Sequence, residues 1–139
     1  MVERMISEIE LLFKEKLEEL GLVDTVVLDF NERIEGESVI ILNISKLKRF
    51  EPVLNGSAYE GEFEAHITGI WKVAEGITDA IEKRNTVLEK LTSEFMYTNL
   101  GTARVMVQAW DKAIWQDVMD DTRYYVAFDI TLTVKNMMR

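Results

Sequence analysis

Apolar and polar residues alternate over residues 123–135, the most informative pattern in the chain. A period of two is typical of a β-strand with one face in a core and one in water. The predicted core face comprises Tyr124, Val126, Phe128, Ile130, Leu132 and Val134. The residues expected to face solvent, a channel or a neighbouring subunit are Arg123, Asp129, Thr131, Thr133 and Lys135. Such a long two-faced strand favours a subunit that builds a ring or a tube.

Two other segments have the spacing of amphipathic helices. Residues 3–20 place Ile6, Ile9, Leu12, Phe13, Leu17 and Leu20 on one face, and Gly21 stands where such a helix ends. A second helix is predicted to begin with Thr78 as cap and Asp79 as first-turn acid, and to run to about residue 96. Its apolar stripe is Ile77, Ile81, Leu88, Leu91 and Phe95.

The remaining patterned segments predict strands. Residues 26–30 and 38–44 are rich in β-branched side chains and flank a polar turn, which predicts a hairpin whose second strand is covered on both faces. Residues 62–72 and 103–110 alternate, and residues 117–122 form a polar connector. The order α-β-β-β-α-β-β predicts an α+β fold. We expect a mixed or largely antiparallel sheet of about five strands with two helices packed on one face.

Periodicity is lost over residues 45–61, which predicts a long irregular connection. This segment holds Lys46, Lys48 and Arg49, the only concentrated positive charge in the chain. A solvated loop explains the cluster, and so does a contact with an acidic neighbouring subunit or a nearby phosphate. The three residues are candidates for an oligomer or partner interface.

Composition limits the class of protein. The 139 residues amount to one domain, residues 1–139, with a formal net charge of −9. Phosphate binding needs clustered Lys and Arg, so the charge disfavours a nucleic-acid-gripping surface and suits a surface past which DNA slides. The chain has no cysteine, which excludes disulfides and thiolate chemistry. No apolar run approaches the roughly 20 residues of a membrane span.

Catalytic motifs are not found. His66 beside Glu64 is a possible acid–base pair, but no nucleophile or second histidine accompanies it. Asp117, Asp120 and Asp121 form an acidic cluster that suits a cation or, equally, a solvated turn. Glycine-rich phosphate loops are missing. We therefore expect a protein that is not an enzyme and has no cofactor, metal or catalytic residue.

Two tryptophans are the remaining candidates for contact with a partner. Large aromatic residues are favoured at the centres of protein–protein interfaces. Trp110 is expected to share a strand face with Arg104 and Gln108, opposite small apolar residues, and Trp115 falls just beyond that strand. An intersubunit role and a core role both remain open for Trp110.

The chain resembles the tail terminator, or tail completion, proteins of long-tailed bacteriophages and related head–tail joining subunits. The likeness comprises an acidic chain beginning with an amphipathic helix, an early strand pair (residues 26–30 and 39–44) and a variable loop. A strand then opens with Tyr-Glu-Gly-Glu-Phe (59–63), a helix like that of residues 81–95 follows, and Asp-Ile-Thr-Leu-Thr-Val (129–134) lies in the last strand. The two tryptophans of residues 109–117 depart from that pattern.

The resemblance implies a hexameric ring that caps the finished tail tube and docks the head connector or head-closure protein. Genomic DNA would pass through its lumen without specific binding, and the protein would belong to the virion after assembly in the host cytoplasm. Ring subunits contact one another through two different patches, so Lys46, Lys48 and Arg49 would meet carboxylates of the next copy. The alternatives are another phage neck or tail-tube subunit, or a small dimeric α+β ligand-binding or enzymatic domain.

Overall fold

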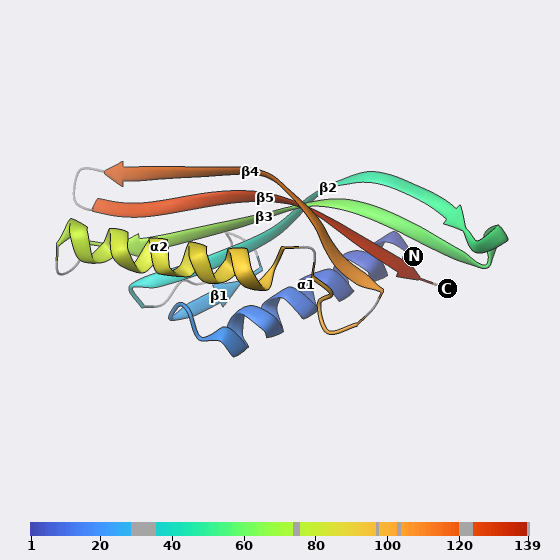
Figure 1. Cartoon of the computed structure of the whole chain (residues 1–139), viewed down its shortest axis with the longest axis horizontal. Helices are drawn as coiled ribbons and strands as arrows, with labels where there is room; N and C mark the ends of the chain where they lie inside the picture. The colour runs from blue at the N-terminus through green and yellow to red at the C-terminus, as the bar shows by residue number, and fades with distance from the viewer. Residues whose placement is uncertain (29–35, 74–75, 97, 103, 120–123, 139) are drawn as a thin grey trace.

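The protein consists of two helices and one sheet, and its computed structural model describes residues 1–28, 36–73, 76–96, 98–102, 104–119 and 124–138. For residues 116–119 and 124 only the backbone is described. The elements are α1 (Val2–Leu20), β1 (Thr25–Val27), β2 (Ser38–Val53), the short 3₁₀ turn η1 (Leu54–Gly56), β3 (Ala58–Lys72), α2 (Ile77–Glu94), β4 (Val105–Met119) and β5 (Tyr124–Met138). The predicted α+β class and element order are confirmed (Figure 1).

The five strands form one mixed sheet in the order β1-β2-β3-β5-β4. β1 pairs with β2 in parallel, in the register Thr25↔Val39, while all other pairs are antiparallel. The predicted hairpin between residues 26–30 and 38–44 is therefore wrong, because a hairpin needs antiparallel strands. Residues 39–42 of β2 are all buried, which confirms that this part of the strand is covered on both faces.

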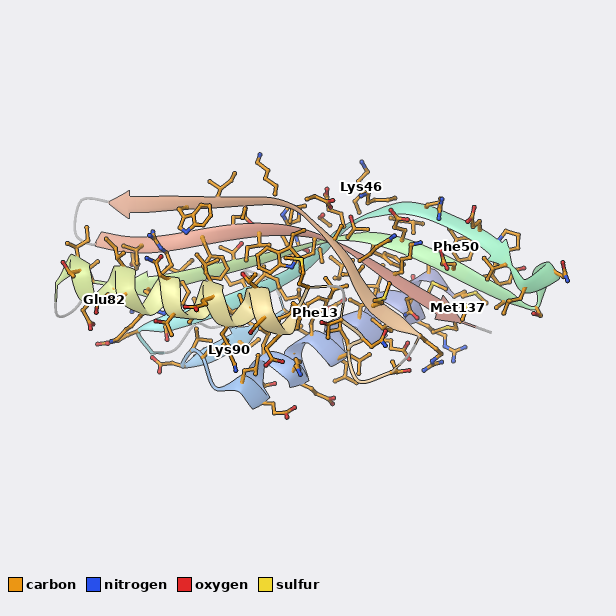
Figure 2. The ribbon with its side chains drawn as sticks, viewed as in Figure 1. Phe13, Lys46, Phe50, Glu82, Lys90 and Met137 are labelled. Atoms are coloured by element: carbon orange, nitrogen blue, oxygen red, sulfur yellow. The ribbon has the colours of Figure 1, made fainter. Side chains whose placement is uncertain are left out.

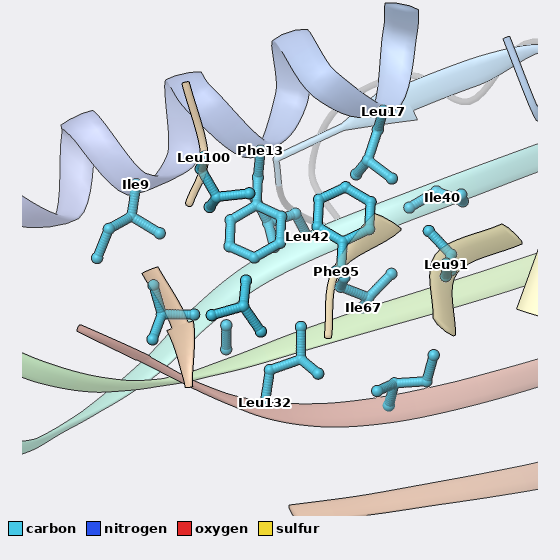
Figure 3. Packing of buried hydrophobic residues seen from close by; sticks show 14 of the residues in the cluster. Ile9, Phe13, Leu17, Ile40, Leu42, Ile67, Leu91, Phe95, Leu100 and Leu132 are labelled. Carbon is cyan, nitrogen blue, oxygen red and sulfur yellow. The ribbon is translucent and has the colours of Figure 1, made fainter. Parts of the chain in front are cut away.

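One apolar cluster joins both helices to one face of the sheet. α1 contributes Met5, Ile9, Phe13 and Leu17, spaced by the three or four residues that a helix face requires. α2 contributes Ala80, Val87, Leu88 and Leu91, and alternate residues of β3 and β5 complete the cluster. Figure 3 shows Phe13 against Phe95, whose rings stack with centroids 5.3 Å apart. Gly21, in the left-handed conformation at φ 62°, ends α1 as predicted.

The core face predicted for β5 is confirmed. Val126, Phe128, Ile130, Leu132 and Val134 are fully buried, and all belong to the same cluster. Arg123, predicted to face outward, lies outside the described residues, and of Tyr124 only the backbone is described.

The start of α2 differs from the prediction. Gly76 is its N-cap, with no side-chain cap bond, so Thr78 does not cap the helix; Asp79 is the first-turn acid as predicted. Ile77, predicted to lie on the apolar stripe, is exposed, whereas Leu88, Leu91 and Phe95 are buried. Arg84 shares the buried side of the helix, and a helical pattern of apolar residues cannot reveal a buried guanidinium.

Residues 45–61 are not the irregular connection that we predicted. β2 continues to Val53 and β3 begins at Ala58, so the two strands project as a long hairpin beyond the helix-covered part of the sheet (Figure 1). β-Bulges interrupt the β2–β3 register between Ile44 and Lys46 and again between Leu47 and Arg49. Each bulge inserts one residue and reverses the inward–outward phase, which removes the alternation from the sequence.

β4 is also longer than predicted. The expected polar connector from residue 117 is strand as far as Met119. Two shifts in the β4–β5 register, between Val107 and Ala109 and between Trp110 and Lys112, again break the alternation. In the described residues, neither helix combines the length and apolar character that a bilayer crossing requires.

Candidate interaction surface

The sheet face turned away from the two helices, here called the open face, is rich in charged residues. The strand registers and side-chain contacts place six basic residues (Lys46, Lys48, Arg49, Lys72, Lys112 and Lys135) and six acidic residues (Glu51, Glu60, Glu62, Glu64, Asp111 and Asp129) on it, together with His66. The basic and acidic residues balance. The net charge of −9 therefore originates elsewhere in the chain.

The predicted basic cluster lies on β2 rather than in a loop, and Lys48 is engaged within the chain. Its ammonium Nζ donates a hydrogen bond to the Thr133 hydroxyl at 2.9 Å. It also lies 3.8 Å from an Asp111 carboxylate oxygen and 3.9 Å from one of Glu62. Lys48 thus connects β2 to β3 and to β4 across the open face.

Arg49 lies further along the hairpin and is similarly surrounded. Its Nη2 atom is 3.5 Å from Glu51, 3.7 Å from Glu60 and 3.8 Å from Glu62. Reversing the charge of Lys48 or Arg49 would place a carboxylate among carboxylates of the same chain. Lys46 is exposed and points away from the helices in Figure 2, which makes it a suitable probe of an intermolecular role for the cluster.

Thr133 does not face solvent, contrary to the prediction. Its side chain is 3% exposed, and its hydroxyl donates to Asp111 Oδ2 at 2.6 Å while it accepts the bond from Lys48. The second β4 bulge contains Asp111 and brings its carboxylate over β5. The alternation assigned Thr133 to the correct face, but it carried no information about what covers that face. Asp129, Thr131 and Lys135 are half-buried on the same face.

His66 lies near the centre of the open face between two carboxylates. Its Nε2 atom is 3.3 Å from Glu64 Oε2, and its Nδ1 atom is 3.3 Å from the Thr131 hydroxyl and 3.7 Å from Asp129 Oδ1. Ser45 donates to Glu64 Oε2 at 3.0 Å. That bond, followed by the bond to His66, holds the pKa of Glu64 below its ordinary value. These contacts connect β2, β3 and β5.

A metal centre is not found in the described part of the chain, where no group of three or more His, Cys, Asp or Glu residues is placed to hold an ion. Asp120 and Asp121 of the acidic cluster considered above lie outside the described residues, and of Asp117 only the backbone is described.

Trp110 lies on the helix side of the sheet. The register change after Val107 pairs it with Leu132, and its half-buried ring packs against the core cluster. Its indole N–H donates to the Phe95 carbonyl at 3.1 Å, just after α2 ends. These contacts give Trp110 a role in joining β4 to α2.

Trp115 is placed differently, since its side chain is 55% exposed. It pairs with Phe128 and therefore lies on the helix side of β4, the edge strand of the sheet. Ile114, one residue earlier, is exposed on the open face. The two exposed side chains therefore lie on opposite faces of β4.

One exposed apolar group was missed in the sequence. Leu47, Phe50, Leu54 and Tyr59 are exposed on the projecting hairpin, and we call them the hairpin patch. The Phe50 and Tyr59 rings stack with centroids 5.4 Å apart and an interplanar angle of 2°. The Phe50 and Tyr59 side chains lie on the helix side of the sheet. Phe50 pairs with Gly61, and Gly61 lies beside the Met5 sulfur on that side. Leu47, Phe50 and Leu54 are spaced by three and four residues, unlike the period of two of a regular strand, so no strand pattern in the sequence grouped them with Tyr59.

A cleft of about 600 Å³ opens at the other end of the molecule, between the end of α1, the start of β2 and α2. Its walls include Asp24, Lys72, Asp79, Glu82 and Lys83. Lys83 and Asp79 form an ion pair of 3.1 Å on α2, and Asp24 accepts hydrogen bonds from the backbone N–H groups of residues 37 and 38. Asp24, Asp79 and Lys83 therefore have partners within the chain.

Comparisons with known proteins assign no family to the chain. No protein-family model matches the sequence, and no curated protein matches it either. The site must therefore be interpreted from its own geometry. That geometry consists of a charge-balanced open face and an exposed apolar patch on the projecting hairpin.

Proposed function

We propose that the protein is a structural virion subunit of a long-tailed bacteriophage. In this proposal, copies of the chain form a hexameric ring that caps the tail tube. One side of the ring binds the tail tube protein, and the other binds the head connector or head-closure protein. The element order and the initial helix support the resemblance on which the proposal rests. β1 and β2 form a parallel pair where we expected a hairpin. The β2–β3 hairpin stands where we expected a variable loop.

The observation that carries the proposal is the projecting β2–β3 hairpin. It extends past the helix-covered core (Figure 1). Its apolar residues Leu47, Phe50, Leu54 and Tyr59 remain 36–54% exposed within one copy. A conspicuous exposed apolar group on a soluble protein usually marks a binding surface. An extension of this kind is expected of a subunit whose hairpin is buried by its neighbours after assembly.

The charge distribution supports passage of DNA through such a ring. α1 carries six acidic residues and three basic ones, while the open face is balanced. A lumen with excess negative charge repels phosphates, which favours sliding over binding. The His66 cluster is compatible with a structural role, because both ring nitrogens lie beside groups of the same sheet.

Native mass spectrometry together with electron microscopy of the purified protein tests the proposal. We expect closed rings of six copies in equilibrium with monomers. Added tail tubes that lack their cap should gain one such ring at one end. Open tubes formed by the chain alone would favour a tail-tube subunit, and a stable dimer would favour the ligand-binding or enzymatic alternative.

The ligand-binding alternative has one specific location, the cleft between α1, β2 and α2. Its mixed walls suit a small polar molecule. A screen of small polar metabolites by thermal shift, repeated with Lys72→Ala, tests this alternative. Stabilisation that disappears in the variant would favour it over the ring.

A further inference from the structure

We propose that Asn55, at the tip of the β2–β3 hairpin, is a modification site where the side-chain amide is lost spontaneously as ammonia. Asn55 and the following Gly56 lie in the turn η1, and both are exposed. The modification itself does not depend on the proposed ring. Its suppression by assembly, argued below, rests on that proposed function.

The reaction needs only water as a co-reactant. The backbone nitrogen of Gly56 attacks the side-chain carbonyl carbon of Asn55, so a new C–N bond forms and the bond from Cγ to Nδ2 breaks. Ammonia leaves with the proton that the Gly56 nitrogen gives up, and a five-membered succinimide ring remains. Water then opens the ring at either of its two carbonyl carbons, which gives aspartate or isoaspartate. One water is consumed and one ammonia is released, without oxidation or reduction.

Glycine after the asparagine is what selects this position in the sequence. The chain has six asparagines, and only Asn55 is followed by glycine. A side chain on the following residue would crowd the attacking nitrogen, and glycine has none. A Cβ placed on Gly56 would meet no atom within 4 Å, so the space around it is open to water.

The other described asparagines are held more firmly. Asn136 is fully buried, and its amide donates to a backbone carbonyl of α1. Asn85 lies within α2, and its side-chain oxygen accepts a hydrogen bond from a neighbouring guanidinium. Asn43 lies in the β2–β3 ladder, and Asn99 forms a bridge to β4. Among the described residues, no hydrogen bond holds the Asn55 side chain.

Ring closure requires the turn to open, because Cγ must come within bonding distance of the Gly56 nitrogen. The turn is strained, since Leu54 at φ +53° and Asn55 at φ +58° are both left-handed. It is closed by Ser57, whose N–H and hydroxyl both donate to the Leu54 carbonyl, at 3.1 and 2.7 Å. Opening therefore breaks few contacts, releases strain and leaves the core intact.

Either product changes the tip of the hairpin. Aspartate adds a carboxylate beyond Glu51 and Glu60, which already face each other across the two strands. Isoaspartate also adds one atom to the backbone of a tight turn. In the proposed ring, neighbouring copies bury the hairpin, so a new charge at its tip would be desolvated at a cost. Assembly in turn would hold the turn closed and suppress the reaction.

Mass spectrometry of peptides from the aged protein tests the site. The purified protein is kept at mildly alkaline pH in water enriched in oxygen-18 and is then digested. The peptide that contains Asn55 is expected to gain mass before any other asparagine peptide and to incorporate one heavy oxygen. Asn55→Gly accepts the left-handed conformation and has no amide, so its peptide should gain none.

A mass gain at Asn43 or Asn99 as fast as that at Asn55 would overturn the proposal. So would an Asn55 peptide that stays unchanged in the folded protein while the same peptide is modified in urea, because the folded turn would then prevent the reaction.

Assembly supplies the second measurement. Rings separated from monomers are expected to gain mass at Asn55 more slowly, and Asn55→Asp should assemble less than Asn55→Gly by native mass spectrometry. Mass gain at Asn55 in a protein that forms no ring would support the site and refute the proposed function. Equal rates in rings and monomers would refute suppression by assembly and leave both the site and the ring.

Discussion

The two ends of the β2–β3 pair are built from the same strands but differ in what stabilises them. At the inner end, residues 39–42 face β3 from Ile67 to Ile70, and helices α1 and α2 cover one side. At the outer end, residues 45–60 are mostly exposed, contain two bulges and are held by ion pairs and the stack of Phe50 on Tyr59. Strand pairing therefore continues where burial stops. The outer end is formed by backbone hydrogen bonds and cross-strand contacts, and apolar residues such as Leu47, Phe50 and Leu54 remain partly exposed there.

Truncating an aromatic ring at each end should show the largest difference. Phe128→Ala opens a cavity where the ring meets Trp71, at a centroid distance of 5.4 Å, and should lower the free energy of unfolding by about 3–5 kcal/mol. Phe50→Ala, the matched change on the hairpin, should cost about 1 kcal/mol or less, since it removes one exposed ring pair. Urea unfolding of the monomer measures both. Equal losses in the free energy of unfolding would contradict the conclusion that core burial stabilises the inner end more than the outer end.

A smaller difference is expected within the open face. Thr133→Ala removes a buried hydroxyl that joins Lys48 to Asp111, so unfolding should become easier by about 1–2 kcal/mol. Thr131→Ala, two residues earlier on the same face, should cost less than about 0.5 kcal/mol. If Thr133→Ala lowers the free energy of unfolding no more than Thr131→Ala does, water must replace the lost hydrogen bonds.

Ion pairs of the hairpin should contribute less still. Arg49→Gln removes a half-exposed guanidinium from three carboxylates and should cost about 0.2–1 kcal/mol at low salt, with the difference shrinking in 1 M NaCl. Lys46→Gln serves as the matched control and should change monomer stability by less. A loss of stability that does not depend on salt would indicate that Arg49 stabilises the hairpin through packing of its aliphatic stem rather than through its ion pairs.

The smallest expected effect is a pH dependence at Glu64. Its pKa in the folded protein is lowered from 4.5, chiefly by the Ser45 hydrogen bond and then by His66. The resulting stabilisation is present above the unfolded-state pKa and is lost as pH falls through the folded-state value. Ser45→Ala should therefore reduce stability at pH 7 more than at pH 2.5, by chemical denaturation at each pH. A loss of the same size at both values would assign the effect of Ser45 to packing.

The sequence by itself determined the elements whose side chains alternate between a core and water. The face of β5 from Val126 to Val134, the stripe of α1 and its end at Gly21, and the buried face of β3 could all be predicted, because burial imposes a period of 2 or 3.6 on the chain. The α+β class followed from the order of these elements.

Tertiary structure alone decided the rest. Bulges reverse the phase of a strand without leaving a local signal, so the hairpin from Ser45 onward and the placement of Trp110 depended on pairing with β3 and β5. The parallel direction of β1 depended on where the chain returns to the sheet. The engagement of Lys48 by Thr133 and Asp111 depended on three strands distant in sequence, because contacts between surface charges leave no periodic pattern in the chain.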